Sequence, residues 1–156
     1  MGVFDKQNQL KPSAMATVAE RRFADAEALA ATKQNSRANG CAYLAGFAVE
    51  ILLKARLVQK FPAIARKRQH EVSANEQEIW GLIWRRHGLE RMLDEMPELE
   101  AGLKKKAERS ETDLFGDLKT VCATWTVYAR YSPATMLMRE AEQLLDRVRA
   151  LKEVLK

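Results

Sequence analysis

The chain has 156 residues, of which 47% are hydrophobic and 30% charged, and it carries a net charge of +5 with an isoelectric point near 9.3. A single domain of this length buries most of its unfolded surface, so it needs neither disulfides nor metal ions to stay folded. The two cysteines and two histidines are too few and too scattered for a metal site or a disulfide framework, and no cofactor motif is present, so we expect no metal and no cofactor. The start lacks an export signal and no apolar run is long enough to span a membrane, which predicts a cytoplasmic protein without membrane contact.

Residue choice favours helix along nearly the whole chain, because alanine, leucine, glutamate, lysine and arginine dominate while glycine and proline are sparse. We therefore predict an all-α protein, a single helical-bundle domain over residues 1–156 in which residues 1–12 are flexible. Four principal amphipathic segments with short connections predict an antiparallel up-down bundle of four to five helices. An irregular excursion is expected at about residues 62–86, where no hydrophobic period persists.

The first two helices are predicted from their periodicity and their boundaries. Pro12 and Ser13 are typical of a helix start, and small or apolar residues recur on one side of the segment from Ala14 to about Thr32. The polar turn QNSRANG separates this segment from a second helix, which we expect to end just before Pro62.

The second helix contains the most informative stretch of the chain, residues 40–57, with the sequence GCAYLAGFAVEILLKARL. Glu50 and Lys54 lie one turn apart on the same face of an otherwise apolar helix, so we predict a buried ion pair. Removing each ion from water costs several kcal/mol, so such a pair indicates a polar site more than a source of stability. The alternative is a solvated pair at the edge of the core, which contributes a few tenths of a kcal/mol.

The excursion combines basic residues with two tryptophans. Trp80, Ile83 and Trp84 share one face of a short predicted helix, which we interpret as a cover for the core or a contact with another chain rather than a base-stacking surface. Short basic clusters permit an anionic partner such as nucleic acid, although solvated surface is the simpler interpretation. The clusters are Arg66–Arg68, Arg85–Arg86 and Lys104–Lys106.

The rest of the chain is predicted to form two short helices and two longer ones. Residues 87–96 and 97–106 are the short helices, separated by a proline. A longer helix is predicted over residues 112–129 before a turn at 130–133, and the last helix begins at about Ala134. The last helix carries a near-heptad stripe that packs either into the bundle or against a second copy of the chain. The stripe consists of Leu137, Ala141, Leu144, Val148, Leu151 and Leu155.

Three of these segments, in this order, resemble the HEPN family of helical bundles. They are AYLAGFAVEILLKARL with Glu50 and Lys54, HGLERML beginning at His87, and the corner VYARYSP, which contains Arg130 and Tyr131. The resemblance covers most of the chain and implies a bundle of four to five helices, often a homodimer. It also implies a role in toxin–antitoxin or phage-defence systems, or beside a nucleotidyltransferase partner, with RNA or nucleotides as ligands.

Carried over by position, the resemblance implies that Glu50, Lys54, His87, Arg130 and Tyr131 line a polar pocket or groove that binds the ligand. Lys54 and Arg130 would supply positive charge for a phosphate, to which arginine offers two parallel donors. We expect His87 to hydrogen-bond to a carboxylate such as Glu50, a structural contact that we favour over a catalytic role.

The chain departs from the nuclease members of the family, which carry an arginine followed, after four to six intervening residues, by a histidine on the late helix. No histidine follows Arg130, while Arg66 and His70 have three intervening residues and lie in the excursion. Without that histidine, the usual attack of a 2′-hydroxyl on phosphate loses its proton carrier.

We therefore predict a non-catalytic module that binds nucleotide, RNA or a nucleotidyltransferase partner. One alternative is a metal-independent ribonuclease toxin that uses a different acid and base, such as His87 with Arg130 or Tyr131. Another is a helical dimerisation or scaffold protein whose last helix forms the interface.

Overall fold

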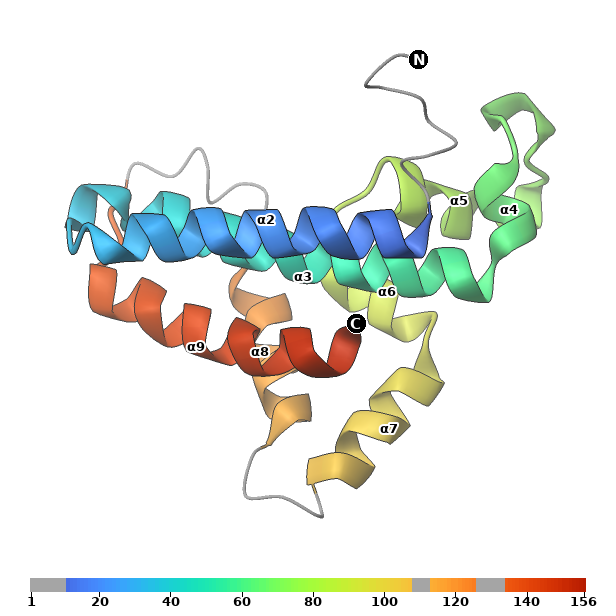
Figure 1. Ribbon diagram of the computed structural model, residues 1–156. Coiled ribbons are helices and arrows are strands. Elements are labelled where there is room, and N and C mark those ends of the chain that lie inside the picture. The colour runs from blue at the N-terminus through green and yellow to red at the C-terminus, as the bar shows by residue number, and fades with distance from the viewer. Residues whose placement is uncertain (1–10, 108–112, 126–133) are drawn as a thin grey trace.

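The computed structural model describes residues 11–107, 113–125 and 134–156. Within these ranges every regular element is a helix and no strand occurs, which confirms the all-α prediction (Figure 1). The α-helices are α2 (Pro12–Ala31), α3 (Ala38–Lys60), α4 (Pro62–Arg66), α5 (Gln77–Trp84), α6 (Leu89–Asp94), α7 (Pro97–Ala107), α8 (Leu114–Thr124) and α9 (Met138–Leu155). Short 3-10 turns, η1 (Asn35–Arg37), η2 (Gln69–Glu71) and η3 (Ala74–Glu76), lie between some of them. None of the helices in the described ranges is both long and apolar enough to pass through a membrane.

Helices α2 and α3 form an antiparallel hairpin that runs along the molecule (Figure 1). Helix α2 begins with a proline in its first turn, where the missing N–H removes no hydrogen bond. Its buried residues recur every three or four positions and are mostly alanine, so the backbone of α3 can approach closely. These residues are Met15, Ala19, Phe23, Ala26 and Ala30.

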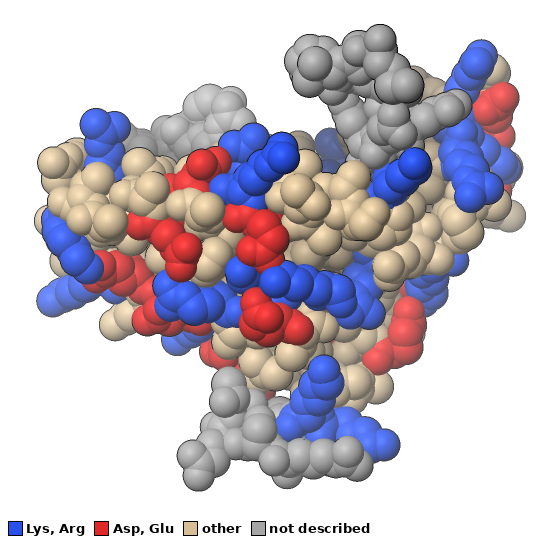
Figure 2. Space-filling view, viewed as in Figure 1, with Lys and Arg blue, Asp and Glu red and all other residues tan. Residues whose placement is uncertain are grey.

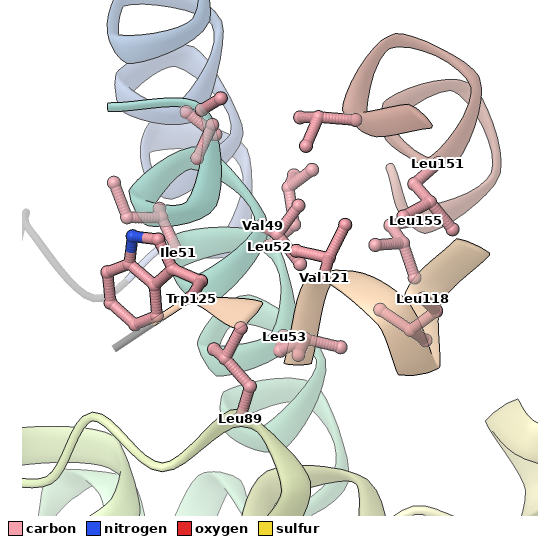
Figure 3. Close-up of a cluster of buried hydrophobic side chains, with 14 of the residues drawn as sticks. Val49, Ile51, Leu52, Leu53, Leu89, Leu118, Val121, Trp125, Leu151 and Leu155 are labelled. Carbon is pink, nitrogen blue, oxygen red and sulfur yellow. The ribbon is translucent and has the colours of Figure 1, made fainter. Parts of the chain in front are cut away.

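Helix α3 is the centre of the fold, because α2, α4, α5, α6 and α9 all pack against it. It is therefore buried on most of its circumference, which explains its almost unbroken apolar sequence. Figure 3 shows its side chains meeting those of α6, α8 and α9 in one core. The labelled residues are Val49, Ile51, Leu52 and Leu53 from α3, Leu89 from α6, Leu118 and Val121 from α8, Trp125 just after α8, and Leu151 and Leu155 from α9.

Contacts at both ends of α9 establish that it runs parallel to α3. Near the start of α3, Asn39 Oδ1 accepts the backbone N–H of Met136 at 2.8 Å. Near the end of α3, Arg56 Nε donates to the carbonyl of Leu155 at 3.0 Å, where the last turn of a helix has unpaired carbonyls. Helix α3 is thus antiparallel to α2 and parallel to α9, as an up-down order allows, whereas α8 runs across these three helices (Figure 1).

The stripe on α9 packs into the bundle, so it is not a free surface for a second copy of the chain. All of its residues except Leu137 are buried, and Leu137 precedes the helix with 39% of its surface exposed. Ion pairs hold the rim of this contact, among them Lys152 Nζ with Glu20 Oε2 at 2.7 Å and Arg149 with Glu27 at 3.1 Å.

The excursion at residues 62–86 is confirmed as a series of short turns and helices. Helix α4 begins at Pro62 and ends after five residues, and η2 and η3 follow before α5. The aromatic face predicted for Trp80, Ile83 and Trp84 lies on α5, where Ile83 is buried and the two indole rings are 6.3 Å apart between centroids.

Two predicted boundaries were wrong. Helix α8 ends at Thr124 instead of continuing to residue 129, and Trp125 already has extended backbone angles. Helix α9 begins at Met138 and not at Ala134, because the side chains of Asn35 and Asn39 bind the backbone of residues 134–138. The first ten residues, predicted to be flexible, lie outside the described ranges, and Pro12 is already helical.

Candidate functional site

Glu50 and Lys54 form the buried ion pair that their spacing predicts. Both lie on α3, and Lys54 Nζ is 2.7 Å from Glu50 Oε1. The Glu50 side chain is completely buried and that of Lys54 is 12% exposed, which rules out the alternative of a solvated pair. Helix α3 holds both ions in the interior because its surroundings on this face are packed helices rather than water.

His87 joins this pair from a different part of the chain. It lies in the turn between α5 and α6, and its Nδ1 is 2.9 Å from the same oxygen, Glu50 Oε1. The predicted hydrogen bond between His87 and Glu50 is therefore confirmed. An ionised carboxylate can only accept, so the contact assigns the hydrogen to Nδ1 and leaves Nε2 as the second polar atom of the ring.

We call Glu50, Lys54 and His87 the polar cluster. Its carboxylate is fully buried, while 46% of the His87 side chain is exposed, so the cluster reaches from the core to the surface. Glu50 Oε2 is also buried, and among the described residues it has no hydrogen-bond partner. An unpaired buried carboxylate oxygen is costly, and such a group is typical of a site more than of a well-packed core.

An aromatic group lies on α3 just before the polar cluster. Trp125 Nε1 donates to the carbonyl of Tyr43 at 3.0 Å, and the rings of these two residues stack with centroids 5.9 Å apart. Tyr43 also stacks on Phe47, with centroids 6.0 Å apart. Gly46 makes this possible, because a Cβ atom there would lie 1.9 Å from Trp125 Cδ1.

The other two residues that the HEPN resemblance implies, Arg130 and Tyr131, lie outside the described residues. The structure therefore brings together three of the five predicted site residues, and the contribution of the other two stays a prediction.

A second candidate site is a pocket that sequence patterns did not predict. It has a volume of about 1040 Å³ and lies at the end of the hairpin where α3, α4 and α5 meet. We call it the basic pocket. Its lining residues are Lys11, Pro12, Val58, Gln59, Pro62, Ala65, Arg66, Lys67, Arg68, Gln69, Trp80, Trp84 and Arg85.

The signals for this pocket are visible in the sequence only as separate pieces. They are the basic clusters at residues 66–68 and 85–86 and the tryptophans at 80 and 84, and no local pattern indicates that these residues share a cavity. Figure 2 shows several Lys and Arg side chains with some acidic ones at the α4 end of the molecule, and basic and acidic residues intermixed over α2 and α9.

One basic residue of the pocket is neutralised. Lys67 Nζ contacts both carboxylate oxygens of Glu76 at 2.6 and 2.7 Å. The hydrogen bond from Lys67, together with the backbone N–H and hydroxyl of Ser73, lowers the pKa of Glu76 to about 2. The loop between α4 and α5 is thus tied together by one carboxylate.

Among the described residues, no three His, Cys, Asp or Glu side chains lie close enough together to hold a metal ion. Comparisons with known proteins identify no relative: no protein family, no curated protein and no solved structure matches the chain. The resemblance to the HEPN family rests on the three sequence segments alone.

Proposed function

We propose that this protein is a non-catalytic, HEPN-like module that binds nucleotide or RNA at the polar cluster. The observation that carries the proposal is that a fully buried carboxylate, Glu50, holds a lysine and a half-exposed histidine at one oxygen. A buried ion set of this kind contributes little to stability compared with apolar packing, so a binding role explains it better.

The chemistry of the cluster fits a phosphate. The Lys54 ammonium, which is paired with Glu50, carries three hydrogens that can be donated, and Glu50 also contacts the exposed imidazole of His87. Hydrogen bonds from a charged ammonium to phosphate oxygens are about twice as strong as neutral ones. Arg130, by the resemblance, would add a bidentate donor.

The test compares the two histidines of the chain. His87→Ala removes the exposed member of the polar cluster, and His70→Ala is the matched control because His70 is an exposed histidine on η2 that is not part of the cluster. We expect His87→Ala and Arg130→Ala each to weaken binding of RNA or nucleotide by about tenfold or more, and His70→Ala to leave it unchanged. Unchanged affinity in both His87→Ala and Arg130→Ala, with helix content intact by circular dichroism, would refute the proposal.

A nucleotidyltransferase partner and a homodimer are further parts of this proposal. A nucleotidyltransferase gene beside this one, and co-purification of the two products, would support the partner. Light scattering on the purified chain tests the homodimer directly, since a monomer at working concentration contradicts it.

A second candidate function is a metal-independent endoribonuclease. The observation that favours it is the hydrogen bond between Glu50 Oε1 and His87 Nδ1, because a carboxylate that orients an imidazole leaves the other ring nitrogen available as a general base. Cleavage of a mixed RNA pool in the presence of a metal chelator, lost in His87→Ala and kept in His70→Ala, would establish this function. An RNA pool that stays intact for hours with wild-type protein would exclude it.

A further inference from the structure

The basic pocket carries an unbalanced positive charge. Its lining includes five basic residues and no acidic one. Of these five, Lys67 is neutralised by Glu76 and Arg85 donates to the amide oxygen of Gln69, whereas Lys11, Arg66 and Arg68 are exposed and form no ion pair with the described residues. Three unpaired cations around one cavity attract an anionic ligand, and a ligand with several regularly spaced charges most of all.

The same pocket has an aromatic wall. Trp80 and Trp84 are both only partly buried, and their rings are tilted by 37° with centroids 6.3 Å apart. Trp80 is held in place, because its Nε1 donates to the carbonyl of Lys67 at 3.0 Å. On its ring lies the guanidinium of Arg85, 5.1 Å from the centroid, which makes a flat, cationic stacking surface.

The wall also contains an unsatisfied donor. Nε1 of Trp84 is buried, and no acceptor for it exists among the described residues. Core tryptophans normally bond this N–H, and Trp80 beside it does so. The unpaired N–H indicates that Trp84 has a role in the pocket besides packing.

From these observations we infer that the basic pocket binds single-stranded nucleic acid. The phosphates lie against Lys11, Arg66 and Arg68, and unstacked bases lie against Trp80, Trp84 and the guanidinium of Arg85. Flat aromatic rings combined with unpaired cations are the recurring solution for single strands, because every base has a π-face and every nucleotide a charge. The volume of about 1040 Å³ is at the upper end for a small-ligand pocket, so it accommodates more than one nucleotide.

The inference rests on the proposed function for the class of ligand, but it uses none of the residues of the polar cluster. The two sites can therefore be tested separately in the intact chain. In this arrangement the basic pocket supplies affinity for the strand, and the polar cluster, whose Glu50 and Lys54 lie on the preceding turns of α3, contacts one nucleotide of it.

The first experiment measures charge. Fluorescence anisotropy with labelled oligouridylate of about 12 nucleotides, long enough for the site sizes usual for single strands, compares Arg66→Glu/Arg68→Glu with Arg21→Glu/Arg139→Glu. The control pair is exposed, lies outside the pocket and changes the net charge equally. We expect the pocket variant to lose at least tenfold in affinity and the control less than threefold. Equal losses in both variants overturn the inference, because they indicate attraction by net charge alone.

The second experiment measures stacking. We expect Trp80→Ala to weaken binding about 5- to 150-fold, the usual effect of removing one stacked aromatic ring, and Trp80→Phe to keep most of the affinity. Because Trp80→Ala also removes the hydrogen bond from α5 to the carbonyl of Lys67, quenching of the wild-type tryptophan fluorescence by the oligonucleotide provides a measurement without a variant. Binding without quenching, or full affinity in a folded Trp80→Ala protein, overturns the inference.

The third experiment varies the ligand. With about three phosphates neutralised, the slope of log affinity against log salt is expected to be about −2. Duplex RNA and heparin at the same charge concentration should bind at least tenfold more weakly, since neither offers free bases. Equal binding of heparin overturns the inference.

The variant His87→Ala separates the two proposals. Loss of affinity in His87→Ala alone supports the polar cluster and rejects the pocket. Loss of affinity in the pocket variants alone supports the pocket and rejects the polar cluster.

Discussion

Glu50 and His87 lie 37 residues apart in the chain, yet Nδ1 of the histidine is 2.9 Å from Oε1 of the glutamate. Glu50 is completely buried in the middle of α3, and His87 is on the surface in the turn between α5 and α6. This hydrogen bond therefore ties the end of the excursion to the central helix. It also places an imidazole with a fixed orientation at the surface above a buried charge.

The first prediction concerns Lys54. Replacing it by methionine removes the ammonium and leaves Glu50 buried with only the histidine as partner. We expect Lys54→Met to lower the free energy of unfolding by about 3 kcal/mol, as is usual when one member of a buried ion pair is removed. Urea denaturation followed by circular dichroism measures this value.

The control for that prediction is the double variant Glu50→Gln/Lys54→Met. It removes both charges while keeping the shape of the side chains, so it is expected to recover at least half of the lost stability. If the double variant were as unstable as Lys54→Met, packing rather than charge would explain the effect.

The second prediction concerns Gly46, over which Trp125 packs. A methyl group at Gly46 would lie 1.9 Å from Trp125 Cδ1 and 2.2 Å from its Cγ, so the indole would have to move. We expect Gly46→Ala to destabilise the protein by about 1–3 kcal/mol and to change the near-ultraviolet circular dichroism of the tryptophan. Gly102→Ala on α7 is the matched control. Nothing lies within 4 Å of a Cβ there, so the gain in helix propensity should stabilise the protein by up to about 1 kcal/mol.

The third prediction concerns the thiols. Both cysteines are buried, and burial raises the pKa of the Cys122 thiol to about 12. At pH 8 only about one Cys122 in ten thousand would be a thiolate, so we expect native protein to react with a disulfide reagent far more slowly than unfolded protein. A Cys41→Ser variant isolates Cys122 in this assay. Fast reaction of that variant under native conditions would contradict the burial of Cys122.

The fourth prediction concerns acid stability of the loop before α5. The contacts with Lys67 and Ser73 lower the pKa of Glu76 to about 2, so Glu76 stabilises the folded state fully above its unfolded pKa, near 4.5. This stabilisation is lost as the pH falls from about 4.5 towards 2. The difference in Tm between wild type and Glu76→Gln is therefore expected to be constant near neutral pH and to shrink below pH 4.5.

Glu71→Gln provides the comparison for Glu76. Its carboxylate lies in the same loop and accepts the backbone N–H of Arg68 at 2.7 Å, without a lysine. We expect its effect on Tm to be the smaller of the two. A pH-independent difference for Glu76→Gln would show that the ion pair with Lys67 does not contribute to stability.

Much of the fold could be predicted because helices are stabilised by contacts between near neighbours in the chain. The period of apolar residues located α2 and α3, and the prolines at 62 and 97 marked the end of α3 and the start of α7. The predicted boundaries failed at α8 and α9. There the side chains of Asn35 and Asn39, about a hundred residues away, hold residues 134–138 in a non-helical path that no local pattern encodes.

The candidate sites show the same difference between features set by near neighbours in the chain and features set by distant segments. The spacing of Glu50 and Lys54 was sufficient to predict their pairing, because residues four apart on a helix share a face whatever surrounds them. The basic pocket could not be foreseen, since its walls come from the start of α2, the end of α3, the turn after α4, and α5. Local periodicity decides which side of a helix is apolar, but a cavity exists only where packed helices leave space between them, and that depends on contacts between distant segments.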